Sequence, residues 1–122
     1  MHVSKRSELG VAAVEFALVV PILVTLIVGT VEFGYRYQQN IEYTNAAMQA
    51  ARLMSIDNDQ SAAIAEVRNF TGNSADEVTF PNGVCSASNK TVQVEVVGNP
   101  ASITHMFGAT FTVEAKGQVR CE

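Results

Sequence analysis

Few residues in this chain have the types and spacing that catalysis requires. The two histidines are His2, near the N-terminus, and His105, which lies in a predicted loop without an acidic neighbour. Cys85 and Cys121 lack the close spacing of metal-ligand pairs, and the sequence contains no glycine-rich phosphate loop. We therefore predict that the protein is not an enzyme and that it uses no cofactor and no metal ion.

The acidic run Asp57-Asn58-Asp59 has the spacing with which a calcium-binding loop begins. Such a loop needs glycine at its sixth position and glutamate at its twelfth, where this chain has Ala62 and Arg68. The run is therefore better explained as a boundary between helices, with Asp59 or Ser61 as the N-cap of the second helix.

The most informative ionisable residue is Glu15, because it lies inside a long apolar run. The run extends from Val11 to Val31 with Glu15 as its sole charge. As a helix it is about 30 Å long, which matches the hydrocarbon thickness of a bilayer. A charge there costs a few kcal/mol. Two explanations remain open: Glu15 reaches the nearby polar edge of the membrane, or it pairs with a positive group on another molecule.

The distribution of charge around this run predicts its orientation. Residues 1–10 contain Lys5 and Arg6, whereas residues 32–122 contain ten acidic and six basic residues. Because positive flanks stay in the cytoplasm, we expect 1–10 to be a cytoplasmic leader, 11–31 a transmembrane helix and 32–122 an extracytoplasmic domain. A cleaved secretory signal is disfavoured, since no Ala-x-Ala-like site follows the run. The acidic excess argues against a nucleic-acid partner.

Beyond the span, the pattern predicts a small α+β domain of about 90 residues. We expect one helix from Val11 to about Ile56, because residues 32–56 lack proline and place apolar side chains at helical spacing. These side chains form two rows, which we expect to face the core: Tyr37, Ile41, Thr44, Met48 and Ala51, and Tyr43, Ala47, Ala50 and Met54.

A second helix and a sheet follow in the prediction. The helix covers about Ser61 to Phe70, buries Ala63, Ile64, Val67 and Phe70, and ends at a glycine cap, Gly72. Alternating or β-branched runs predict short strands at 78–80 and 84–85 and longer ones at 91–97 and 109–121. The fold class is thus a long N-terminal helix, a second helix and a three-to-four-stranded antiparallel sheet.

The two cysteines are both in the part assigned to the outside. In an oxidising compartment an even number of cysteines favours a disulfide. Cys121 also lies on the inward-facing side of its predicted strand, as a bridge to Cys85 requires. We therefore predict a Cys85–Cys121 disulfide, with two buried free thiols as the alternative.

The segment from residue 8 to about 54 resembles the TadE-like family. The resemblance is carried by Gly10-Val-Ala-Ala-Val-Glu15-Phe16-Ala-Leu-Val-Val-Pro21, then Val31-Glu32-Phe33-Gly34, Asn45-Ala-Ala and Ala50-Ala51-Arg52. Members of this family are pseudopilins, or minor pilins, of the bacterial tight-adherence (Flp, type IVb) pilus system for cell adhesion. The resemblance implies a pilin-like fold and a structural role.

The resemblance also implies a processing site and a set of partners. A prepilin peptidase of the inner membrane would cut after Gly10, where glycine lets an extended backbone enter the protease closely. Val11 would become the N-terminus, and Glu15 and Phe16 the fifth and sixth mature residues, with Glu15 pairing with the amine of a neighbouring subunit. Many other type IV pilins have phenylalanine where this chain has Val11, so N-methylation there is left open.

Two functional hypotheses follow from these observations. In the first, the chain is a single-pass protein of the bacterial inner membrane whose partners are the lipid bilayer, other pilins and pseudopilins, the prepilin peptidase and the inner-membrane assembly machinery. Entry into the surface pilus itself is left open. In the second, the chain is an uncleaved, signal-anchored envelope protein whose outer domain binds a ligand or a partner protein.

Overall fold

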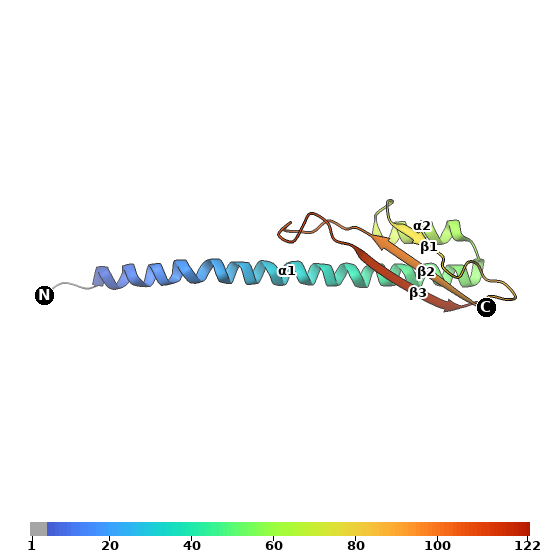
Figure 1. The fold of residues 1–122 in the computed structure, drawn as a ribbon, viewed down its shortest axis with the longest axis horizontal. Coiled ribbons are helices and arrows are strands. Elements are labelled where there is room, and N and C mark those ends of the chain that lie inside the picture. The colour runs from blue at the N-terminus through green and yellow to red at the C-terminus, as the bar shows by residue number, and fades with distance from the viewer. Residues whose placement is uncertain (1–4) are drawn as a thin grey trace. The chain divides into compact units, whose positions relative to one another are not determined.

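The structure is a computed structural model that describes residues 5–122, with side chains from Glu8 onward. Its elements are α1 (Lys5–Asp57), α2 (Gln60–Thr71), β1 (Glu77–Thr79), β2 (Thr91–Gly98) and β3 (Val113–Arg120), drawn in Figure 1. The chain divides into two compact units, Met1–Gly34 and Tyr35–Glu122. The predicted α+β class is confirmed, although the first four residues of the predicted leader lie outside the described residues.

Helix α1 begins at Lys5 rather than at Val11. Residues 5–10 contain no proline, and Glu8 in the first turn interacts favourably with the positive end of the helix dipole. Gly10 is therefore helical in this structure. Pro21 lies inside the helix, and the hydroxyl of Thr25 donates to its carbonyl oxygen at 2.7 Å. This bond adds a second donor to the Pro21 carbonyl, whereas the carbonyl that loses its helical N–H donor to the proline is that of Ala17.

The connection between the two helices is set by two capping residues. Asn58 follows α1 in the left-handed conformation, with φ of 52°, and its N–H donates to the carbonyl of Met54. Asp59 is the N-cap of α2, since its carboxylate accepts from the backbone N–H groups of Ser61 and Ala62 at 2.9 and 3.3 Å. Of the two predicted caps, Asp59 is therefore correct. Gly72 closes α2 with φ of 68°, as predicted.

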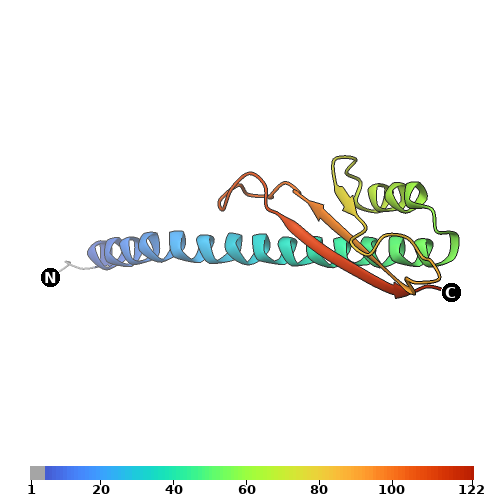
Figure 2. The same ribbon diagram turned by 45° about the vertical axis from the view of Figure 1, so that its right-hand side comes forward.

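The sheet has three strands in the order β1-β2-β3, and both pairings are antiparallel. Its inward face carries Val92, Val94 and Val96 of β2 together with Val113 and Ala115 of β3, and all five are buried. The alternation read from the sequence predicted this face correctly. Figure 2 shows β2 and β3 crossing the stretch of α1 that belongs to the second unit.

The short strand predicted at Val84-Cys85 does not form. Two side chains take the backbone groups that a strand would use. The amide of Asn89 donates to the carbonyl of Val84 at 3.0 Å, and Asn58 brackets Cys85, accepting from its N–H at 2.9 Å and donating to its carbonyl at 3.1 Å. Local side-chain bonds of this kind compete with strand pairing. The long strand predicted at 109–121 is also shorter, since only an isolated bridge joins Ala101 to Thr110.

The core of the second unit lies between α1 and the sheet, and α1 contributes mainly small residues to it. A Cβ atom built on Gly117 of β3 would lie 2.5 Å from the carbonyl carbon of Ala47, so strand and helix backbones almost touch. Alanines let the elements approach this closely. The α1 residues in the core are Tyr43, Ala46, Ala47, Ala50, Ala51 and Met54.

Cys85 and Cys121 form a disulfide, with their Cα atoms 5.9 Å apart. The bridge ties the loop before β2 to the residue that follows β3. The side chain of Asn58 also bonds to the backbone of Cys85. Cys85 therefore joins three segments, which are the α1–α2 connection, the loop before β2 and the end of β3.

Candidate functional site

Within the first unit, α1 presents apolar side chains on every side. Phe16, for example, is 71% exposed. Among the described residues, α1 is the one helix long and apolar enough to cross a membrane. An exposed apolar surface of this extent indicates contact with lipid or with partner proteins. The exposed large apolar side chains are Leu9, Val11, Val14, Phe16, Leu18, Val19, Ile22, Leu23, Val24, Leu26, Ile27, Val31 and Phe33.

The four residues singled out for processing and assembly all lie on this part of α1. Val11 and Glu15 are four positions apart, so they lie on one face of the helix, one turn from each other. Glu15 and Phe16 are both exposed. A Cβ atom on Gly10 would meet no atom within 4 Å, so packing within the chain does not require glycine there. The helix therefore carries a glycine that weakens it by about 1 kcal/mol without a packing benefit in the described structure.

In the second unit, one of the two predicted apolar rows is wrong. Tyr37 is 70% exposed, Ile41 and Thr44 are exposed as well, and Met48 is half-buried, so only Ala51 of this row lies in the core. The other row is buried throughout. The sheet lies close to the alanines and covers a narrow strip of α1, which leaves Tyr37 and Ile41 uncovered. We call Tyr37, Ile41 and Met48 the uncovered stripe.

A buried polar cluster, which the sequence analysis did not identify, joins α1 to the turn before β1. Asp76 is 1% exposed, and its carboxylate accepts hydrogen bonds from Tyr43, Thr71 and Asn73 at 3.0, 2.5 and 2.9 Å. Burial, and secondarily the Asp76 carboxylate, raises the pKa of Tyr43 from 10.0 to about 12. A Cβ atom on Gly98 would collide with Tyr43 and Asp76, so β2 closes the cluster. This arrangement is fully bonded and positions the elements.

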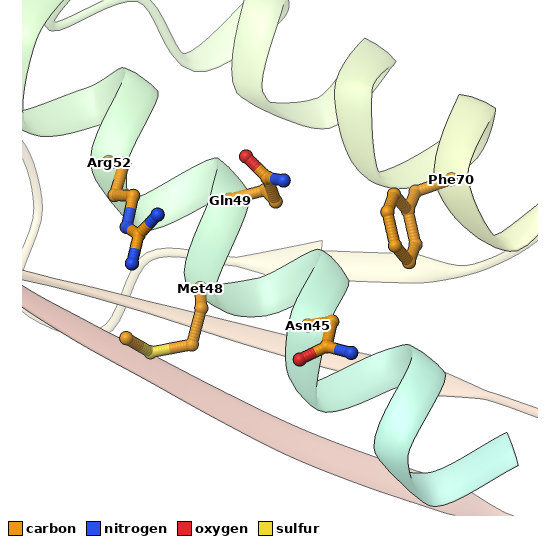
Figure 3. A pocket seen from close by; sticks show the side chains of 5 residues that line it. All are labelled: Asn45, Met48, Gln49, Arg52 and Phe70. Carbon is orange, nitrogen blue, oxygen red and sulfur yellow. The ribbon is translucent and has the colours of Figure 1, made fainter. Parts of the chain in front are cut away.

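A shallow groove of about 200 Å³ lies between α1 and α2 (Figure 3). Four of its residues come from α1, and Phe70 comes from α2. Phe70 was expected in the core but is 41% exposed, because the buried side of α2 is formed by Ala63 and Val67. The groove therefore offers an aromatic ring beside amide groups and a guanidinium. Its residues are Asn45, Met48, Gln49, Arg52 and Phe70.

The sequence comparison bears on the part of the chain that holds the predicted processing and assembly residues. The model of the family described as TadE-like protein matches residues 10–52. This segment is TadE-like. The match confirms the resemblance over this segment, which is about a third of the chain. No curated protein and no solved structure matches the chain.

The matched segment ends inside α1, so the TadE-like part is helix alone. It contains Gly10, Val11, Glu15 and Phe16, the uncovered stripe, and all four alanines that α1 contributes to the core. Helix α2, the sheet and the disulfide lie beyond it. The segment therefore includes both the exposed helix surface and the inward strip that holds the domain.

Proposed function

We propose that the chain is a TadE-like pseudopilin, a structural protein of the bacterial inner membrane for assembly of a tight-adherence (Flp, type IVb) pilus. In this proposal a prepilin peptidase cuts after Gly10, residues 11–31 span the membrane, and residues 32–122 face outward. The observation that carries it is the surface of α1: a glycine without a packing role, followed by Val11 and Glu15 on one exposed face of an apolar helix.

The cut would convert this face into a pair of opposite charges. Hydrolysis of the Gly10–Val11 bond leaves a carboxylate on Gly10 and an amine on Val11, which is largely protonated at neutral pH. The new ammonium and Glu15 then lie about 6 Å apart along the helix axis. A neighbouring pilin shifted along this axis brings its ammonium opposite Glu15, so that both charges are neutralised in the hydrocarbon. The pairing fixes the axial register between subunits.

The uncovered stripe supports the same assignment in the second unit. Tyr37, Ile41 and Met48 recur at spacings of four and seven, so they lie along one side of α1. Large side chains that stay exposed, as Tyr37 and Ile41 do, or half-buried, as Met48 does, are typical of a helix that packs against other helices. Other pilins or pseudopilins are the partners that this surface fits.

The processing step can be tested by substituting Gly10 and determining the mature N-terminus. We expect mass spectrometry of the wild-type protein to find Val11 at the N-terminus. Gly10→Ala should be processed in part, and Gly10→Leu should accumulate as the longer precursor, because a bulky side chain blocks the close approach of the peptidase. Gly29→Leu is the matched control, since a Cβ atom on Gly29 also meets open space, and it should mature normally.

Normal maturation of Gly10→Leu, or a wild-type protein that keeps Met1, would exclude processing at this bond. The chain would then fit the second hypothesis, an uncleaved signal-anchored envelope protein. In that case the groove beside Phe70 is the first surface of the outer domain to examine for a ligand or a partner protein.

A further inference from the structure

The connection between β2 and β3 is the most apolar exposed loop of the second unit. We call residues 100–111 the apolar loop. It contains no Asp, Glu, Lys or Arg, although the chain as a whole has 20 such residues. Ile103, Met106 and Phe107 are 53%, 52% and 55% exposed. Three large apolar side chains on one uncharged loop indicate a contact with an apolar surface.

The loop is held by its own hydrogen bonds, so its apolar side chains do not fold inward. The N–H of Ser102 donates to the carbonyl of Ala109 at 2.9 Å, and its hydroxyl donates to the carbonyl of Gly108. At the base of the loop, the N–H of Phe111 donates to the carbonyl of Pro100 at 3.2 Å. The tip turns at His105, where φ is 56°. The exposed trio is thus a defined feature of the fold.

The base of the loop is fixed to the first residues of α1 in this unit. The rings of Phe111 and Tyr35 meet edge to face with centroids 6.1 Å apart. The Arg36 guanidinium lies 4.9 Å from the ring centroid of Phe111 and 5.9 Å from that of Phe107, and it donates to the Phe107 carbonyl at 3.4 Å. Figure 2 shows the apolar loop beside α1, near the first residues of α1 that belong to the second unit.

The position of these two residues in the sequence brings the loop near the membrane. Tyr35 and Arg36 follow Val31, the last residue of the proposed span, by four and five positions. Residues 31–36 are helical, and five residues advance a helix by about 7.5 Å. The polar interface of a bilayer is about 5–7 Å deep on each side. Side chains attached to Tyr35 and Arg36 are therefore within reach of it.

We propose that the apolar loop is a second membrane contact, in which Ile103, Met106 and Phe107 enter the boundary between headgroups and acyl chains. The partner of the loop is the lipid of the leaflet that faces the domain. The loop has no charged side chain, so it can enter the boundary between headgroups and acyl chains without burying a charge. The proposal rests on the part of the proposed function that places α1 across the membrane. It adds a second attachment, which restricts how the domain rotates about its anchor.

The absence of tryptophan from the chain makes a direct test possible. Full-length Phe107→Trp and Phe70→Trp are reconstituted separately into phosphatidylcholine vesicles whose acyl chains carry bromine near the headgroup end. Leu23→Trp is reconstituted into vesicles whose acyl chains carry bromine near the methyl end, because residue 23 lies near the middle of the proposed span. Bromine quenches indole fluorescence only at contact range. Leu23→Trp reports insertion of the span, and Phe70→Trp is the matched aromatic control on α2. Met106→Trp repeats the loop measurement where Phe107→Trp disturbs the contact with Arg36.

We expect bromolipid to quench Phe107→Trp at least about twofold more than Phe70→Trp, and we expect the reverse order for aqueous iodide. Equal quenching of both, with Leu23→Trp strongly quenched, would overturn the loop contact while leaving the anchor intact. Protection of Phe107→Trp from iodide without bromolipid quenching would overturn it in favour of a second copy of the chain. An unquenched Leu23→Trp would overturn both the anchor and the loop contact.

Discussion

Substitution of Glu15 can distinguish two explanations of this charge. In one it pairs with another subunit, and in the other it only reaches the polar edge of the membrane. If Glu15 only reaches the membrane edge, Glu15→Gln should have almost no effect, because lipid accepts an amide more easily than a carboxylate. If it pairs with the ammonium of a neighbour, the change leaves that ammonium without a counter-ion, at a cost of a few kcal/mol per contact. We expect Glu15→Gln to insert and mature normally but to fail in crosslinking to partner pilins and in piliation.

Two further variants make this comparison sharper. Glu15→Asp should be intermediate, because the charge remains while the side chain is shorter. Glu8→Gln should have no effect on assembly, since the proposed cut removes residue 8 from the mature protein. Full piliation by Glu15→Gln would show that this carboxylate does not set the register between subunits.

Tyr43 gives a prediction for the alkaline range. Its folded-state pKa of about 12 lies above the ordinary value of 10.0, because burial and the neighbouring Asp76 disfavour the phenolate. The stabilisation is therefore complete below pH 10 and is lost as pH rises from 10 to 12. Urea unfolding in detergent micelles should show a free energy of unfolding that falls by about 2 kcal/mol over this range. Tyr43→Phe should remove this part of the pH dependence, and an unchanged slope would exclude Tyr43 as its source.

At the scale of elements, the contact between β3 and α1 depends on Gly117. A Cβ atom there would lie 2.5 Å from the backbone carbonyl carbon and oxygen of Ala47, which cannot rotate away as a side chain can. We expect Gly117→Ala to lower the free energy of unfolding by about 1–3 kcal/mol. The matched control is Gly34→Ala, where a Cβ atom meets open space. It should leave stability unchanged or raise it by up to about 1 kcal/mol. Similar stability of Gly117→Ala and wild type, by thermal unfolding, would contradict this packing.

The sequence was most informative where one local rule determines an element. Alternation in 91–97 predicted the buried valines of β2, and the glycine cap predicted the end of α2 at Gly72. It was least informative where two elements compete for the same surface. The spacing of Tyr37 and Ile41 on α1 is as regular as that of Tyr43 and Ala47, and only the close approach of the sheet decides which row is covered.

Long-range polar contacts could not be predicted either. The Asp76 cluster brings in Tyr43, which is 33 residues from Asp76 in the sequence, and nothing near Asp76 marks it as buried. The same is true of Asn58, whose side chain binds Cys85 and contributes to the loss of the strand predicted at 84–85. Helix α1 begins earlier than the apolar run predicts, because residues 5–10 contain no proline and a single glycine does not end the helix.

At the scale of the whole molecule, the disulfide can report on which side of the membrane the proposed outer domain lies. Cys85 and Cys121 are 36 residues apart in sequence, and a link over this distance restricts the unfolded chain by about 4 kcal/mol in the chain-entropy account. Such bridges persist outside the cytoplasm and are reduced within it. An outward domain should therefore contain the bridge in cells, whereas an inward domain should contain two thiols.

Thiol labelling of protein denatured without reductant tests both the bridge and the orientation. We expect no labelled cysteine in protein isolated from the envelope and two after reduction. The Cys85→Ser/Cys121→Ser variant should insert as the wild type does but lose about 4 kcal/mol of stability, since its unfolded chain is no longer restricted. Each single variant is a control for stray pairing, because it retains one thiol that can form a linked dimer. Two labelled cysteines in unreduced wild-type protein would place the domain in a reducing compartment, and the proposed topology, with the pilin assembly that depends on it, would then be wrong.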